Sequence, residues 1–162
     1  MSPNSIPIRL TIAEICLAAL MEAADGIEAA HDTAAFQAAL DSNHRLWLAM
    51  RALGERDGGT VPSFRDSEFS ILESSRLGVG GADATIEALV AINRRMANAL
   101  GANGDIPRIR TRVRLAYRES CGGGLVPWLL AQMNRKDHLR SLFVPAAERN
   151  PEQRAVGGSA SG

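Results

Sequence analysis

The sequence is short of aromatic residues, cysteines, lysine and long apolar runs. Its 162 residues include two Trp, one Tyr and four Phe. Two cysteines, Cys16 and Cys121, are too few for a disulfide framework or a four-ligand zinc site. No stretch approaches roughly 18 apolar residues without a charge, so we expect no membrane span. The opening MSPNSIPIRL lacks the basic and apolar regions of a secretory signal. These absences predict a cytoplasmic globular protein with reduced thiols.

The charges are balanced overall but unevenly distributed. The chain has 18 basic and 18 acidic residues, and Lys136 is the only lysine. Residues 1–105 hold 8 basic and 14 acidic side chains, whereas residues 106–162 hold 10 basic and 4 acidic ones. The first part therefore carries a net charge of −6 and the second part +6. The two parts could attract each other, or each could face its own partner.

Apolar residues recur at helical spacing, and β-branched runs are scarce, which predicts an all-α protein. Thr11 and Glu14 have the capping-box spacing, and a helix is expected from there to about residue 30, with Gly26 as a point where it could break. Further helices are expected over 34–53, 66–77 and 84–100. Gly54 is expected to end the helix over 34–53. Together the four segments predict a small antiparallel helical bundle.

Residues 106–118 allow two interpretations. Ile109, Val113 and Ala116 keep helical spacing, but arginines also alternate with apolar or small residues as in a strand. The helical neighbourhood, with Asp105 as a cap, favours a helix. Further helices are expected from Leu125 and over 137–143. The expected organisation is an N-terminal tail (1–10), a helical bundle (11–104), a basic, Arg-rich helical extension (105–144) and a disordered tail (145–162).

The sequence offers no constellation of residues that indicates catalysis. His31, His44 and His138 are scattered, and none has the spacing of a metal site or a catalytic base. The glycine clusters at 78–81 and 122–124 lack the Lys-Ser or Lys-Thr pair of a phosphate loop. We therefore expect a protein that is not an enzyme, with no cofactor and no metal.

An arginine run is the strongest chemical feature of the sequence. In a helix, arginines four residues apart would share a face and could hold phosphates. They could equally dock on the acidic part of the chain or on an acidic partner. Only Tyr117 is nearby to stack on nucleic-acid bases, so nucleic-acid binding is the alternative function. This basic patch consists of Arg108, Arg110, Arg112, Arg114 and Arg118.

Three large or polar residues fall on the inner faces of the predicted helices. Trp47 lies mid-helix on an apolar face, which favours a core position over a partner anchor. The two roles are compatible if the helices leave a groove. Asn43 and Asn93 would be buried, and a buried amide needs hydrogen-bond partners such as a facing helix.

Two segments together resemble a known family. Residues 39–50 read ALDSNHRLWLAM, with Asn43, Leu46 and Trp47, and residues 87–101 read EALVAINRRMANALG. The second segment contains the pattern Leu89, Ile92, Asn93 and Arg94. Over about residues 11–104 the chain resembles the FlaF family of flagellar biosynthesis regulators, which are small helical cytoplasmic proteins.

The resemblance implies a non-enzymatic role in flagellin synthesis or export. It implies action by protein binding, with flagellin or a flagellin-expression factor as the partner. Helices 34–53 and 84–100 would then form the shared core and a groove. The residues expected to contact the partner are Asn43, Leu46, Trp47, Asn93 and Arg94.

Overall fold

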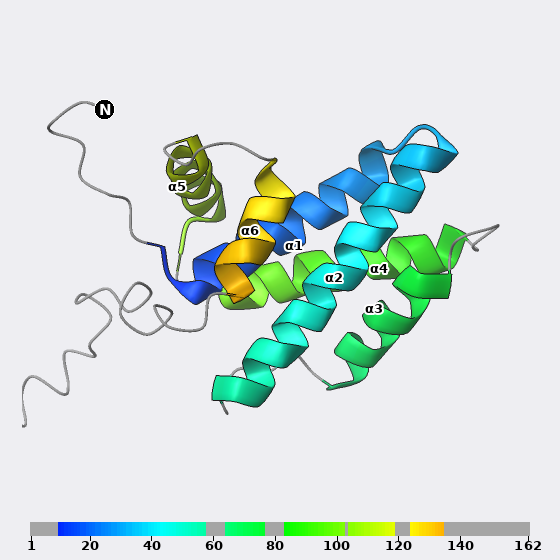
Figure 1. Ribbon diagram of the computed structural model, residues 1–162, viewed down its shortest axis with the longest axis horizontal. Coiled ribbons are helices and arrows are strands. Elements are labelled where there is room, and N and C mark those ends of the chain that lie inside the picture. The colour runs from blue at the N-terminus through cyan, green and yellow to red at the C-terminus, as the bar shows by residue number, and fades with distance from the viewer. Residues whose placement is uncertain (1–9, 58–63, 77–82, 103, 119–123, 135–162) are drawn as a thin grey trace, which may run out of the picture.

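The structure is a computed structural model that describes residues 10–57, 64–76, 83–102, 104–118 and 124–134 (Figure 1). All regular secondary structure in these ranges is α-helical, which confirms the predicted fold class. The helices are α1 (Ile12–Ala29), α2 (Thr33–Asp57), α3 (Phe64–Arg76), α4 (Asp83–Leu100), α5 (Ile106–Arg118) and α6 (Leu125–Asn134).

Helix α1 begins at the predicted cap and forms the centre of the bundle. The Glu14 backbone N–H donates to Thr11 Oγ1 at 3.0 Å, which satisfies a donor that the first helical turn leaves open. Gly26 does not break the helix, which continues to Ala29. Leu17, Leu20 and Ala24 are completely buried. The helix is apolar over much of its surface because other helices cover it on several sides.

Helices α2, α3 and α4 form where the sequence predicts them, with differences at some of their ends. Helix α2 is capped by Asp32, whose Oδ1 accepts from the Ala35 N–H at 2.7 Å. The expectation that Gly54 ends this helix is wrong, since α2 continues to Asp57 with Gly54 buried inside it. A helical glycine costs only about 1 kcal/mol relative to alanine, which tertiary packing can offset.

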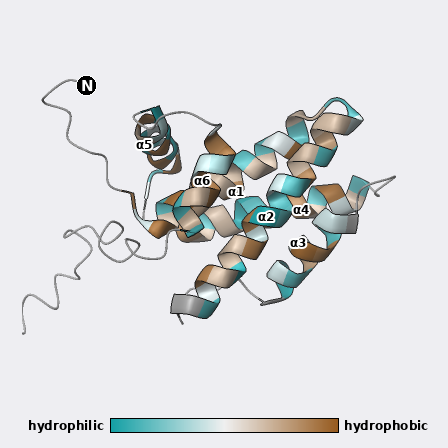
Figure 2. Ribbon diagram, viewed as in Figure 1, coloured by the Kyte–Doolittle hydropathy of each residue, from teal (hydrophilic) through white to brown (hydrophobic). Residues whose placement is uncertain are grey.

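Helix α5 settles the ambiguity at 106–118 in favour of a helix. Asp105 caps it by accepting from the Arg108 N–H at 3.3 Å. Figure 2 shows hydrophilic and hydrophobic residues mixed along α5. Its apolar positions at helical spacing give it an inner face, from which Val113 is 1% exposed. The helix expected over 137–143, residues 1–9 of the tail expected at 1–10, and the tail expected at 145–162 lie outside the described residues. Leu10, the last residue of the expected N-terminal tail, is instead 5% exposed and belongs to the core.

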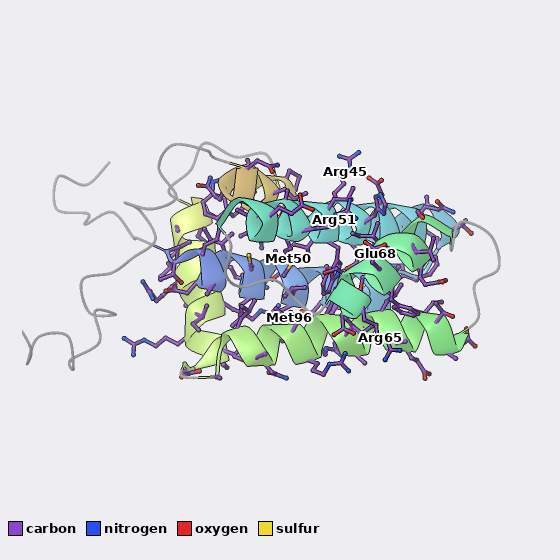
Figure 3. All side chains as sticks on the ribbon, turned by 90° about the horizontal axis from the view of Figure 1, so that it is seen from below. Arg45, Met50, Arg51, Arg65, Glu68 and Met96 are labelled. Carbon is purple, nitrogen blue, oxygen red and sulfur yellow. The ribbon has the colours of Figure 1, made fainter. Side chains whose placement is uncertain are left out.

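The helices α1, α2 and α4 run along one another, with both neighbours antiparallel to α1 (Figure 1). Figures 1 and 3 show α5 lying crosswise at one end of this group. Helix α6 packs on α1 and α2, and its Leu129 and Met133 are completely buried in the same core as α1. The described part of the predicted extension therefore shares the core of the bundle. None of the described helices has the length and apolarity needed to cross a membrane.

Candidate functional site

A buried hydrogen-bond network connects the two segments that carry the family resemblance. The Trp47 indole Nε1–H donates to Asn93 Oδ1 at 2.8 Å. Asn93 Nδ2 donates to Asn43 Oδ1 at 2.7 Å and approaches the Leu20 carbonyl at 3.5 Å. Asn43 Nδ2 in turn donates to Ser74 Oγ at 2.7 Å. The network therefore ties α1, α2, α3 and α4 together, as expected for two amides on inner helix faces.

Four of the five residues expected to contact a partner lie in the interior. Asn43, Trp47 and Asn93 have no exposed surface, and Leu46 is 1% exposed. The structure thus gives Trp47 the core position that its apolar helix face favours. A partner could touch these side chains only after a covering helix moves away.

Arg94 is the member of this set that reaches the surface. Its guanidinium holds Glu28 of α1 through two hydrogen bonds of 2.6 and 2.8 Å, and approaches Asp25 at 3.4 Å. The hydrogen bond from Arg94 lowers the pKa of Glu28, and the same bond raises the pKa of Arg94. The pair therefore links α4 to α1 beside the buried network, in a position that solvent and partners can reach.

Three arginines of the basic patch are bound to acidic residues of α1. Arg110 contacts Asp25 at 2.7 Å and Glu22 at 3.1 Å, and Arg114 contacts the same Glu22 at 2.9 Å. Arg110 and Arg114 thus share a helix face, as their spacing predicts. On the other side of α5, Arg112 contacts Glu14 at 3.0 Å. Helix α5, within the basic part of the chain, is docked on the acidic residues of α1, one of the outcomes that the charge distribution allowed.

This docking weakens the case for nucleic-acid binding. Within the described residues only Arg108 and Arg118 of the patch make no ion pair. Burial alone would lower the pKa of Arg110, but its bonds to Asp25 and Glu22 outweigh that effect and raise it. A phosphate would have to displace these carboxylates before it could use most of the patch.

A cavity lies where α5 meets the start of α1 and the end of α4. Its volume is about 520 Å³, with Leu17, Leu100 and Ile109 as its apolar wall. Glu14, Asp105, Arg108 and Arg112 also line it. Their charges cancel, and the Glu14–Arg112 pair occupies part of the polar wall. The cavity therefore offers no clear charge preference to a ligand.

Packing of α3 in the bundle is expected from the sequence, but the serines that form its contact with α2 and α4 were not identified there. Ser67, Ser70 and Ser74 are 1%, 0% and 6% exposed, and their spacing places them on one face of α3. Ser74 accepts from Asn43, but the hydroxyls of Ser67 and Ser70 have no hydrogen-bond partner among the described residues. Serines at helical spacing are the sequence signal for this buried face, and a search for apolar residues alone does not detect it.

Among the described residues, the remaining titratable groups are scattered and make few contacts with one another. Burial raises the pKa of the Cys16 thiol to about 12, so the nucleophilic thiolate is scarce at neutral pH. His44 makes a 2.9 Å hydrogen bond with the Ile71 carbonyl, and His31 is exposed. No group of three or more potential metal ligands gathers in the part of the chain that is described. Cys121 and His138 lie outside that part.

Comparison with models of known protein families, with curated proteins and with solved structures finds no match to this chain.

Proposed function

We propose that this chain is a non-enzymatic, protein-binding regulator of flagellum biogenesis that acts in the cytoplasm on flagellin synthesis or export. The proposal starts from the resemblance of residues 39–50 and 87–101 to the FlaF family. The partner would be flagellin or a factor that controls its expression. No cofactor is required for such a role.

The observation that supports the proposal most is the contact between these two segments. They are far apart in the sequence, yet Trp47 of the first donates directly to Asn93 of the second, and Asn93 donates back to Asn43. The residues that carry the resemblance therefore form one structural unit. Arg94 extends this unit to the surface through Glu28.

A gene deletion tests the biological role. In a flagellated cell that encodes the chain, deletion should change the amount of flagellin and shorten or remove the filaments. Normal flagellin levels together with normal filaments would contradict the proposal. Complementation with the intact gene is the control for polar effects.

A binding experiment tests the direct interaction. Purified chain should retain flagellin from a lysate, and purified flagellin should bind it without other components. Arg94→Ala should weaken this binding if its surface position contributes, whereas Arg45→Ala removes a comparable surface ion pair with Asp41 and should not. Equal binding by both variants would remove Arg94 from the interface.

A further inference from the structure

Helix α3 packs on α2 and α4, and the space that it fills between them, here called the groove, has arginines along its edges. Figure 3 shows α3 between α2 and α4. On the α2 side, Arg51 contacts Glu68 at 3.2 Å, and these two labelled side chains lie together in the figure. On the α4 side, Arg95 contacts Asp66 at 3.0 Å. The acidic residues belong to α3 and the arginines to the bundle, so the groove selects a helix with acidic residues on both flanks.

The inner face of α3 leaves polar groups unsatisfied in this groove. Ser67 and Ser70 are fully buried there without a hydrogen-bond partner among the described residues. A buried hydroxyl that loses water and gains no partner opposes docking. An apolar residue at either position would avoid that cost, so α3 is a weaker occupant than a helix of ordinary amphipathic pattern.

The surface under α3 includes Asn43, one of the residues that the resemblance assigns to partner contact. Ser74 covers Asn43, and the Ile71 carbonyl covers His44, both in α2. Phe69 packs against the smaller core cluster formed by α1, α2 and α4. If α3 leaves, Asn43 and its neighbours on α2 become accessible while α1 and α4 remain in contact.

We propose that α3 occupies the binding site of an acidic amphipathic helix of a protein partner, and that this partner helix displaces α3 from the groove between α2 and α4. The partner helix carries acidic residues that match Asp66 and Glu68. It has small apolar residues in place of Ser67 and Ser70. It also keeps a hydrogen-bond acceptor at the position of Ser74, because Asn43 would otherwise lose its partner. This inference rests on the proposed protein-binding function.

A synthetic peptide can serve as the partner helix. The probe is residues 64–76 with S67A and S70A, capped at both ends and labelled for fluorescence anisotropy. The same peptide without substitutions is the reference, and a version that also carries D66K and E68K is the charge control. We expect the S67A/S70A peptide to bind the full chain about tenfold more tightly than the reference peptide. The charge control should not bind.

Two versions of the full chain separate displacement from binding elsewhere. The docked α3 competes with the peptide at a high effective concentration, so a chain with D66K and E68K should bind the peptide at least about tenfold better than the unaltered chain. A chain with E55K and E87K changes two exposed acidic residues outside α3 and should bind like the unaltered one. Circular dichroism and tryptophan emission show whether each chain is folded.

Hydrogen exchange of the unaltered chain provides an independent measurement that needs no variant. At saturating S67A/S70A peptide, the amides of residues 64–76 of the chain should exchange faster, while those of α1 and α4 stay protected. Protection of α3 that persists at saturation would overturn the proposal. So would equal binding of the charge control, or absence of binding to every chain. If instead the unaltered chain forms a dimer that the peptide dissolves, the occupant is a second copy's α3 and the proposal fails.

These experiments contain no flagellin. A failure here therefore leaves the proposed role in flagellum biogenesis open to its own tests. Conversely, displacement of α3 by the peptide together with a failure to bind flagellin would keep the groove and discard that partner.

Discussion

The indole N–H of Trp47 on α2 donates to the side-chain carbonyl of Asn93 on α4 at 2.8 Å, across 46 residues of sequence. Neither side chain is exposed. Each of these groups would be an unsatisfied polar atom in the core without the other, so the pair fixes how the two helices align.

Asn93→Ala should destabilise the fold strongly. It leaves the Trp47 N–H and the Asn43 carbonyl without partners in the interior, at a cost of about 2–4 kcal/mol. Chemical denaturation followed by circular dichroism measures this change. Asn98→Ala, at an exposed position of the same helix, is the matched control and should change the free energy of unfolding by less than about 0.5 kcal/mol. Similar losses in both variants would contradict the role of the network.

The ion pairs between α5 and α1 should contribute measurably and lose strength in salt. Arg110 and Glu22 are 23% and 20% exposed, so a double-mutant cycle with Arg110→Gln and Glu22→Gln should give a coupling of about 1 kcal/mol. Near 1 M NaCl the coupling should fall, because ions screen partly exposed pairs.

The Asp41–Arg45 pair is the internal control for that cycle. Its side chains are 59% and 67% exposed, and both lie in α2. Its coupling should be about 0.3 kcal/mol or less. If the two cycles give the same value, the partial burial of the α5 pairs adds nothing.

Two glycine substitutions should act in opposite directions. In Gly26→Ala the new Cβ would meet only Ala39 Cβ, at 4.0 Å, and alanine is the better helix former. We expect a gain of about 0.5–1 kcal/mol in stability. In Gly101→Ala the Cβ would lie 2.7 Å from Leu17 Cδ1 and 3.1 Å from Ile106 Cγ1. Leu17 is fully buried and cannot move aside easily, so a loss of about 1–3 kcal/mol follows.

Melting temperatures of the two glycine variants check this pair of predictions. A loss of stability in Gly26→Ala would show that the helix is strained at this point. An unchanged Gly101→Ala would show that the contact between α1 and the end of α4 can widen without cost.

The thiol of Cys16 should make stability depend on pH in the alkaline range. Burial raises its pKa from 9.0 to about 12 in the folded chain. The unfolded chain therefore ionises first, so this contribution to stability is complete below pH 9.0 and is lost between pH 9.0 and about 12. From pH 8 to pH 10 the loss from this group is about 1.4 kcal/mol.

Cys16→Ala isolates this effect. The substitution lowers stability at every pH because it removes buried volume. The additional fall between pH 8 and pH 10 should nevertheless be smaller than in the unaltered chain, since the group that titrates is gone. Urea midpoints at the two pH values give the comparison, with Cys121 unchanged in both chains. An equal fall in stability between pH 8 and pH 10 in both chains would show that Cys16 does not cause the alkaline loss.

The sequence predicted the helices well because their signals are local. Thr11 and Asp105 act as caps where expected, and α4 begins one residue before its expected start and ends where predicted. The end of α2 was missed because local helix propensity does not reveal that Gly54 is buried in the folded chain. Local signals thus set where helices begin more reliably than where tertiary packing lets them end.

Only part of the candidate site could be predicted from the sequence. The amides Asn43 and Asn93 were recognised as buried polar groups in need of partners, and they bond to each other. Asn43, however, is covered by Ser74 of α3, and the serine face of that helix has no apolar pattern that would identify it as a packing surface. Which arginines of α5 pair with α1 was equally hidden, because it depends on the crosswise position of that helix.

The burial of Leu129 and Met133 against α1 has a consequence for how the protein is made. On the ribosome, α1 emerges first, but the side chains that complete its core are more than a hundred residues behind it. An incomplete nascent chain thus exposes apolar surface of α1 until α6 has left the exit tunnel. A message truncated before that helix would yield a product prone to aggregation and degradation.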